Sequence, residues 1–98
     1  MLNYWSIKKY GTKLLPTLEK RFGKQDYFDA NQIRSTVYQK DFNPKHLPLA
    51  YILFLSPESL STVMANEFPD LDINAYKKEM LDYLSSKSYQ GYLQVLAQ

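Results

Sequence analysis

The sequence predicts an all-α fold, a single compact domain of five or six short helices. Apolar residues recur at every third or fourth position along the first segment, which is the spacing of one helix face. Helix-start signals and prolines divide the remainder into short helices. The most apolar run, residues 47–55, has the length of a buried strand, but no second strand candidate exists to pair with it. We therefore expect one helical domain over residues 1–98, with the last ~10 residues frayed.

The first helix is predicted over about residues 2–22. Pro16 removes one backbone donor and crowds the carbonyl of Thr12, so we expect a kink there, with a complete break as the alternative. Gly23 is expected to end the helix as its C-cap residue. The expected inner stripe is Tyr4, Ile7, Gly11, Leu14, Leu18 and Phe22.

The second helix is predicted to begin at Asp29 and to run to about Asp41. Gln32 follows Asp29 by three residues, which is the spacing of a capping box in acidic form. Pro44 prevents the helix from continuing. The apolar run that follows is expected to be the central buried helix, with Pro48 in its first turn.

Two further helices are predicted from their start signals. Ser56 is expected as an N-cap followed by a proline, and this helix should continue until Pro69. Asp72 is expected to cap the next helix, which residues 85–88, a serine-rich stretch, should end. A short final helix is predicted over about residues 89–96.

Composition excludes several classes of protein. The chain has 98 residues, no cysteine, 45% hydrophobic and 22% charged residues, so a disulfide scaffold, a disordered tail and a collagen-like fibre are excluded. An enzyme with separate cofactor and substrate domains would need a longer chain. The start lacks the apolar stretch of a secretory signal, and the longest apolar run is too short to span a bilayer. We expect a cytoplasmic protein without a transmembrane segment.

Charge is unevenly distributed along the chain, although the net charge is only +2. Residues 1–25 carry six basic side chains against one acidic one, residues 26–50 carry three of each, and residues 51–98 carry three basic against six acidic. The three segments therefore have net charges of +5, 0 and −3. This polarity would steer an anionic partner to the N-terminal third. The alternative, which we prefer, is that the basic helix lies beside the acidic half of the same fold.

The first helix carries the candidate surface for an anionic partner. An outward tryptophan among lysines would stack on a nucleobase or insert at a membrane interface. In the alternative interpretation, Trp5 packs against the C-terminal helices and the lysines are simply solvated. The candidate residues are Trp5, Lys8, Lys9, Lys13, Lys20, Arg21 and Lys24.

Nine tyrosines suggest a second candidate surface. Tyrosine combines a large contact area with a polar end and is frequent at interfaces. Tyr83, Tyr89 and Tyr92 near the C-terminus are candidates for a protein interface or a homodimer seam. In the alternative, they cover a small core.

Catalytic and metal-binding signatures are sparse. His46 is the only histidine, and a metal site built without cysteine would need several carboxylates around it. We interpret His46 as a surface or capping residue. The acidic run at residues 70–74 begins like a calcium loop, but Ala75 and Leu81 occupy the positions that require glycine and glutamate. We therefore name no catalytic, cofactor-binding or metal-binding residue and expect no cofactor.

A series of short motifs between residues 10 and 54 carries a family resemblance. In order, they are Tyr10, Gly11, Leu15, Pro16, Leu18, Arg21, Phe22, Gly23, Phe28, Asp29, Gln32, Ile33, Pro48, Ala50, Tyr51 and Phe54. The pattern resembles a small bacterial family of uncharacterised helical proteins, a domain of unknown function, whose members run "YG…LP…L…RYG…YT…QV…PYA…F". Phe22 replaces the usual tyrosine, and Asp29 replaces a threonine while preserving the capping chemistry. The resemblance implies a helical fold and a bacterial origin, and it implies no activity.

The function that we expect is that of a non-catalytic helical interaction domain of a bacterial cytoplasmic protein. Its partner would be an unidentified protein or a second copy of the chain. The alternative is a small nucleic-acid-binding protein that uses the basic N-terminal helix, and a small enzyme is third.

Overall fold

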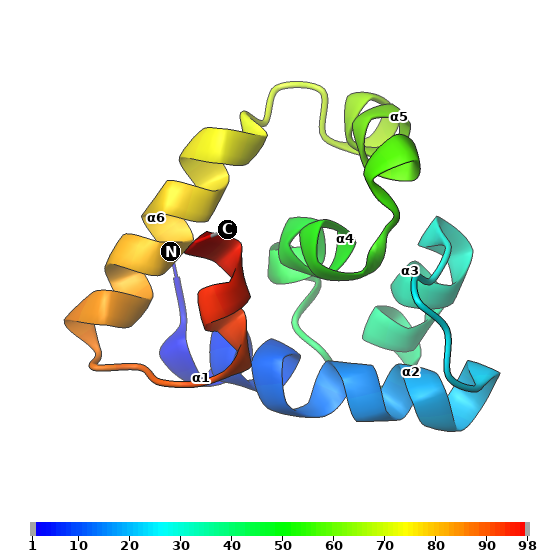
Figure 1. The fold of residues 1–98 in the computed structure, drawn as a ribbon, viewed down its shortest axis with the longest axis horizontal. Coiled ribbons are helices and arrows are strands. Elements are labelled where there is room, and N and C mark those ends of the chain that lie inside the picture. The colour runs from blue at the N-terminus through cyan, green and yellow to red at the C-terminus, as the bar shows by residue number, and fades with distance from the viewer. Residues whose placement is uncertain (1, 98) are drawn as a thin grey trace.

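The computed structural model describes residues 2–97, and this part of the chain is all-α, without a strand (Figure 1). The predicted fold class is confirmed. The α-helices are α1 (Tyr4–Lys9), α2 (Leu15–Phe22), α3 (Ala30–Gln39), α4 (Leu47–Phe54), α5 (Pro57–Glu67) and α6 (Ile73–Ser86). The other helical segments are the π-helical turn η1 (Tyr10–Leu14) and the 3₁₀ segments η2 (Pro44–His46) and η3 (Tyr92–Ala97).

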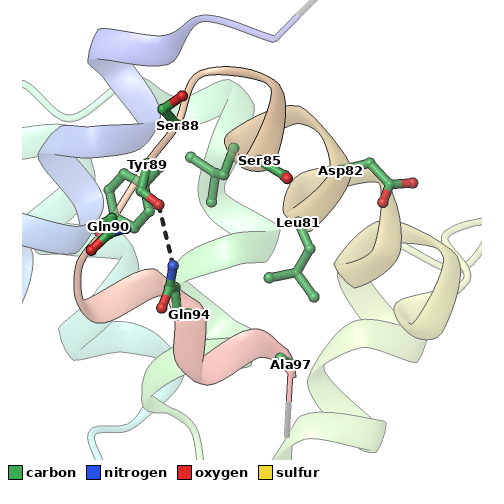
Figure 2. Close-up of a pocket in the computed structure, with 9 residues that line it drawn as sticks. Leu81, Asp82, Ser85, Ser88, Tyr89, Gln90, Gln94 and Ala97 are labelled. Carbon is green, nitrogen blue, oxygen red and sulfur yellow. Dashed lines mark hydrogen bonds between the residues drawn. The ribbon is translucent and has the colours of Figure 1, made fainter.

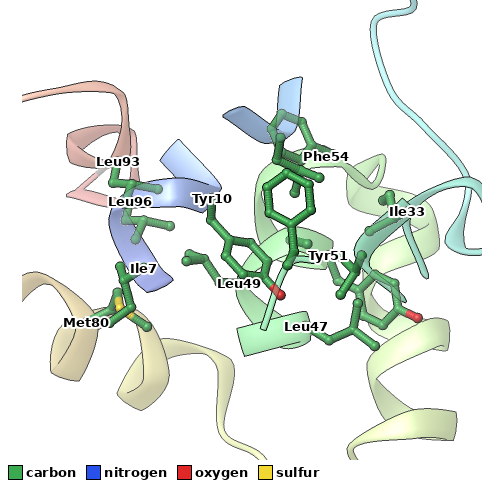
Figure 3. Packing of buried hydrophobic residues seen from close by; sticks show 14 of the residues in the cluster. Ile7, Tyr10, Ile33, Leu47, Leu49, Tyr51, Phe54, Met80, Leu93 and Leu96 are labelled. Atoms are coloured by element: carbon green, nitrogen blue, oxygen red, sulfur yellow. The ribbon is translucent and has the colours of Figure 1, made fainter. Parts of the chain in front are cut away.

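Helix α4 lies at the centre of the fold, with the other helices arranged around it (Figure 1). Leu47 to Tyr51 are all buried, which confirms the prediction of a central buried helix with Pro48 in its first turn. One hydrophobic cluster draws side chains from every α-helix and from η1 and η3 (Figure 3). Burying an apolar side chain contributes about 1.5–3 kcal/mol, so this cluster supplies most of the driving force for folding.

The segments α1, η1 and α2 form one bent rod, so the predicted helix is continuous through Pro16 (Figure 1). The expected kink takes the form of the π-helical turn that immediately precedes α2. A wider turn accommodates a proline because the ring has no N–H and crowds the carbonyl four residues earlier. Ile7, Leu14 and Leu18 are buried as expected, and Tyr10 is buried with them. The predicted Gly11 is half-buried and faces Leu93 of the C-terminal segment.

The capping box of α3 is confirmed in both directions. The backbone N–H of Gln32 donates to Asp29 Oδ1 at 2.8 Å, and the Asp29 N–H donates to Gln32 Oε1 at 3.0 Å. The helix ends at Gln39, two residues earlier than predicted. Asp41 adopts a positive φ of 61°, which turns the chain towards η2.

The N-caps of α5 and α6 are also confirmed, since Ser56 and Asp72 both accept backbone N–H groups. The expected breaker at residues 85–88 begins too early, because α6 continues through Ser86. The final helix is a 3₁₀ segment that starts three residues later than predicted. Its side chains Leu93 and Leu96 lie in the core, so this segment completes the hydrophobic cluster.

Within residues 2–97, no helix is both long enough and apolar enough to cross a membrane.

Candidate interaction surface

The outer side of the α1–α2 rod carries an exposed tryptophan and a row of lysines. Trp5 is 72% exposed, and Lys13 and Lys20 are exposed on the side of the rod opposite its buried stripe. Lys8 is half-buried, and Lys24 is exposed just beyond the end of α2. We call this set, Trp5, Lys8, Lys13, Lys20 and Lys24, the basic face. Trp5 therefore does not pack against the C-terminal helices, because Ile7 and Tyr10 take the inward positions of the rod.

Two neighbours surround the Trp5 ring. Tyr4 contacts it edge-on, with the ring centroids 5.4 Å apart and the planes at 71°. The Lys8 ammonium lies 5.2 Å from the centroid of the Trp5 ring. Such a cation–π contact at an exposed site is worth about 0.5–1 kcal/mol. It places a positive charge directly beside an accessible aromatic surface.

The other two predicted surface residues, Lys9 and Arg21, are engaged within the fold. The Lys9 ammonium donates to the carbonyl oxygen of Asp41 at 2.8 Å. The Arg21 guanidinium donates to Thr36 Oγ1 at 2.9 Å and to Gln39 Oε1 at 2.6 Å. These contacts hold the rod against α3 and the turn that follows it, so Lys9 and Arg21 have a structural role.

Carboxylates do not form ion pairs with the basic face. In the part of the chain that the structure describes, the ion pairs are Arg34–Glu67 at 2.6 Å and Lys78–Asp82 at 2.9 Å. Glu67 and Asp82 belong to the acidic half of the chain, and their cationic partners lie outside the basic face. The lysines of the basic face therefore keep their charge uncompensated by direct ion pairing.

The three candidate tyrosines differ in exposure. Tyr89 is only 6% exposed, and its hydroxyl accepts a hydrogen bond from the backbone N–H of Leu93. Tyr83 is half-buried beneath the Lys87 ammonium. Tyr92 is 45% exposed and stacks on Phe54. Tyr89 thus belongs to the core, and Tyr92 is the most exposed of the three.

His46 is 3% exposed, so the first of its two predicted roles, a surface residue, was wrong. It does occupy the N-cap position of α4, although its side chain makes no capping hydrogen bond. The 3₁₀ turn η2 directs His46 inward, against the edge of the Tyr10 ring, and leaves Lys45 exposed. Burial, together with nearby positive charge that includes Lys45, lowers the pKa of His46 below its usual value. The Nε2 atom has no hydrogen-bond partner among the described residues. A general base normally needs an orienting partner, so this geometry does not support one.

A polar network links α3, α4 and α5, and sequence analysis did not anticipate it. Arg34 Nη1 donates to Glu67 Oε2 at 2.6 Å and to the Tyr51 hydroxyl at 3.0 Å. The Tyr51 hydroxyl in turn donates to Glu67 Oε1 at 2.6 Å. Burial, with a smaller contribution from Glu67, raises the pKa of Tyr51 to about 12. No sequence pattern signals this network, because its members are 16 and 17 residues apart.

A hollow of about 670 Å³ lies between α6 and η3 (Figure 2). Two of its polar side chains are engaged within the fold: Asp82 pairs with Lys78, and the Gln94 amide donates to the carbonyl oxygen of Tyr89. A hydrolytic site would need a nucleophile with a base beside it, and no histidine lines this hollow. Nor do the described residues contain a group of three or more histidines and carboxylates that could hold a metal ion.

Comparison with known proteins gives one match. A protein-family model whose description is "family of unknown function" matches residues 1–92. No curated protein and no solved structure matches the chain.

Proposed function

Because the chain belongs to DUF6559, a family of unknown function, we propose its role from its own surface: it is a non-catalytic interaction domain that binds an anionic partner through the basic face. One observation carries this proposal. Trp5 is 72% exposed on a rod whose basic face, within residues 2–97, has no ion pair with a carboxylate. We propose the bacterial cytoplasm as its location, with which the absence of cysteine agrees.

The energetics of folding support a binding role for Trp5. Tryptophan is highly buried on average, and its burial would add a large apolar contribution to a core of this size. Here the core is completed without it, by Ile7 and Tyr10 from the same rod. The exposed ring therefore contributes little to folding, and its surface is free to contact a partner.

The non-catalytic part of the proposal is supported by how the reactive side chains are used. His46 is buried, and its Nε2 atom has no hydrogen-bond partner in the described part of the chain. Glu67 is bound by Arg34 and Tyr51, and Asp82 is bound by Lys78. Each of these groups serves the fold, and none converges with another on a cavity.

Trp5 provides the experiment that tests the basic face, because it is the only tryptophan in the chain. We expect its fluorescence to change saturably on titration with inorganic polyphosphate, a polyanion that has neither bases nor side chains. The response should weaken as salt is raised, since the contacts are between solvent-exposed charges. Lys13→Glu with Lys20→Glu should abolish it.

The matched control is Lys78→Glu with Lys87→Glu, which changes the net charge equally but on α6 and at its C-cap. This variant should respond to polyphosphate like the unmodified protein. If both variants lose the fluorescence response equally, net charge alone explains the binding, and the proposal that polyphosphate binds at the basic face is refuted. An enzymatic activity that disappears in His46→Ala would refute the non-catalytic role.

A further inference from the structure

We infer that the anionic partner is a single-stranded nucleic acid, with one base stacked on Trp5 and the sugar–phosphate backbone following the lysines of the basic face. This inference rests on the proposed function and names the partner of the same surface. It draws on the type of cation on the face, the surroundings of Trp5 and the length of the rod.

The cations of the basic face are all lysines. Both arginines that are described near α3, Arg21 and Arg34, have their guanidinium groups engaged within the fold. Lysine acts as a point charge and binds a phosphate without the fixed two-point geometry of a guanidinium fork. The lysines therefore supply the charge that a phosphodiester backbone needs, and the exposed Trp5 ring is what distinguishes a nucleic acid from an acidic protein as the partner.

Trp5 supplies the stacking surface that single-stranded binders use. Its ring is 72% exposed, and the Lys8 ammonium lies 5.2 Å from its centroid. A base stacked on this ring would bring its own phosphate close to that charge. Bases within a duplex are already stacked on their neighbours, so this contact selects unpaired strands.

The rod has the length of a short oligonucleotide. Trp5 and Lys20 are 15 positions apart, which at 1.5 Å per residue is about 20 Å. A single strand laid along the face would span a few nucleotides over that distance. The face also lacks the apolar stripe that anchors an amphipathic helix in a membrane, since Trp5 is the one large apolar side chain that is strongly exposed on the described part of the rod.

The experiment measures the fluorescence anisotropy of a fluorescein-labelled 12-nucleotide oligothymidine, a readout that does not depend on Trp5. We expect Trp5→Ala to weaken binding about tenfold and Trp5→Phe by a smaller factor, because phenylalanine retains a stacking ring. Lys13→Gln with Lys20→Gln should weaken binding and reduce the salt slope by about 1.4. The control, Lys78→Gln with Lys87→Gln, should bind like the unmodified protein. Circular dichroism checks that each variant is folded.

Polyphosphate, polyglutamate, a duplex of the same length and anionic phosphatidylserine vesicles serve as competitors. We expect the unlabelled oligonucleotide to compete best, and Trp5→Ala to leave polyphosphate binding unchanged. If Trp5→Ala binds the oligonucleotide as well as the unmodified protein does, stacking is refuted while the basic face stands. Stronger competition by polyglutamate, the duplex or vesicles overturns the inference in favour of that partner. Failure to bind any polyanion refutes both proposals.

Discussion

At the scale of the residue, burial decides the chemistry of His46. An exposed imidazole would be half-protonated near pH 6.5, but this one lies in the core beside Tyr10. Its pKa is lowered, with burial as the largest cause. The Tyr76 hydroxyl is also buried and has no hydrogen-bond partner of ordinary geometry among the described residues. Burial raises the pKa of Tyr76, and the nearby backbone of Leu49 partly opposes that rise. Folding therefore favours the neutral form of His46.

The pKa of His46 predicts how stability depends on pH. Since the pKa is lower in the folded than in the unfolded chain, the unfolded chain binds the proton first as the pH falls. The free energy of unfolding should therefore decrease as the pH is lowered through about 6.5. Urea denaturation at pH 7.5, 6.5 and 5.5 measures it. In His46→Phe and His46→Gln this part of the pH dependence should be absent, and an unchanged slope in both variants would contradict the assignment.

A second prediction at this scale concerns the Tyr51 hydroxyl. Tyr51→Phe should reduce the free energy of unfolding by about 1 kcal/mol, because it removes the hydroxyl that hydrogen-bonds to both Arg34 and Glu67. The partial exposure of Arg34 and Glu67 keeps their own ion-pair contribution small. A double-mutant cycle with Glu67→Gln should give a coupling of about 0.5–1 kcal/mol. Tyr83→Phe is the control, and additivity of Tyr51→Phe and Glu67→Gln would show that the network does not act as a unit.

At the scale of the element, Gly11 determines how closely the rod and η3 approach. A Cβ added at Gly11 would lie 2.7 Å from Leu93 Cγ and 3.1 Å from the Tyr89 hydroxyl. Real Cβ atoms do not approach other atoms so closely, so the C-terminal segment would have to move. The glycine sits in the π-helical turn, where the rod already departs from regular α-helix. Gly11 thus serves the packing between two elements that are distant in sequence.

Gly11→Ala tests this packing, because the two possible effects change the free energy of unfolding in opposite directions. Alanine favours a helix over glycine by about 1 kcal/mol, so helix propensity alone predicts stabilisation. Overpacking against Leu93 predicts a loss of about 1–3 kcal/mol, and we expect this loss to dominate. Guanidinium denaturation distinguishes the two signs. When Leu93 is already alanine, adding Gly11→Ala should cost less stability than it does in the unmodified protein, because the clashing side chain is gone. Stabilisation of the unmodified protein by Gly11→Ala would contradict the close approach.

At the scale of the whole molecule, the C-terminal segment completes a small core by packing against α6 and the N-terminal rod. Leu93 is fully buried, and Tyr89 and Leu96 are nearly so, against α6 and the rod. A domain of this size has a total stability of about 5–15 kcal/mol. The three side chains of the last ten residues are thus a substantial part of what holds the fold together.

Truncation after Ser88 should therefore abolish cooperative folding. Removing these three side chains forfeits about 5 kcal/mol of apolar burial and exposes the inner face of α6. Thermal denaturation followed by circular dichroism should show a broad, non-cooperative change in the truncated chain. Substitution of the exposed Gln90 by alanine is the control and should leave the transition intact. A sharp transition at an unchanged midpoint in the truncated chain would show that η3 is dispensable.

The sequence alone determined the helices, because their start signals and periodicities are local. Asp29, Ser56 and Asp72 each act within three residues of their own position, so their caps were predictable. The positions of Trp5 and of the lysines on the outer side of the rod also follow from helical spacing. Bounds or helix type were mistaken at the end of α3, which stops at Gln39, at Ser85, where the helix continues, and in the last segment, where 3₁₀ geometry replaces α.

Only the tertiary structure decided which of these side chains are free. Whether Lys9 and Arg21 are surface cations depends on the turn and helix packed against them, which lie 15 to 32 residues away. The burial of His46 and the joining of Arg34, Tyr51 and Glu67 depend equally on distant elements. Ion pairing and desolvation are properties of neighbours in space, and a local pattern carries no record of them. The exposed Trp5 with its unpaired lysines is therefore visible only in the folded molecule.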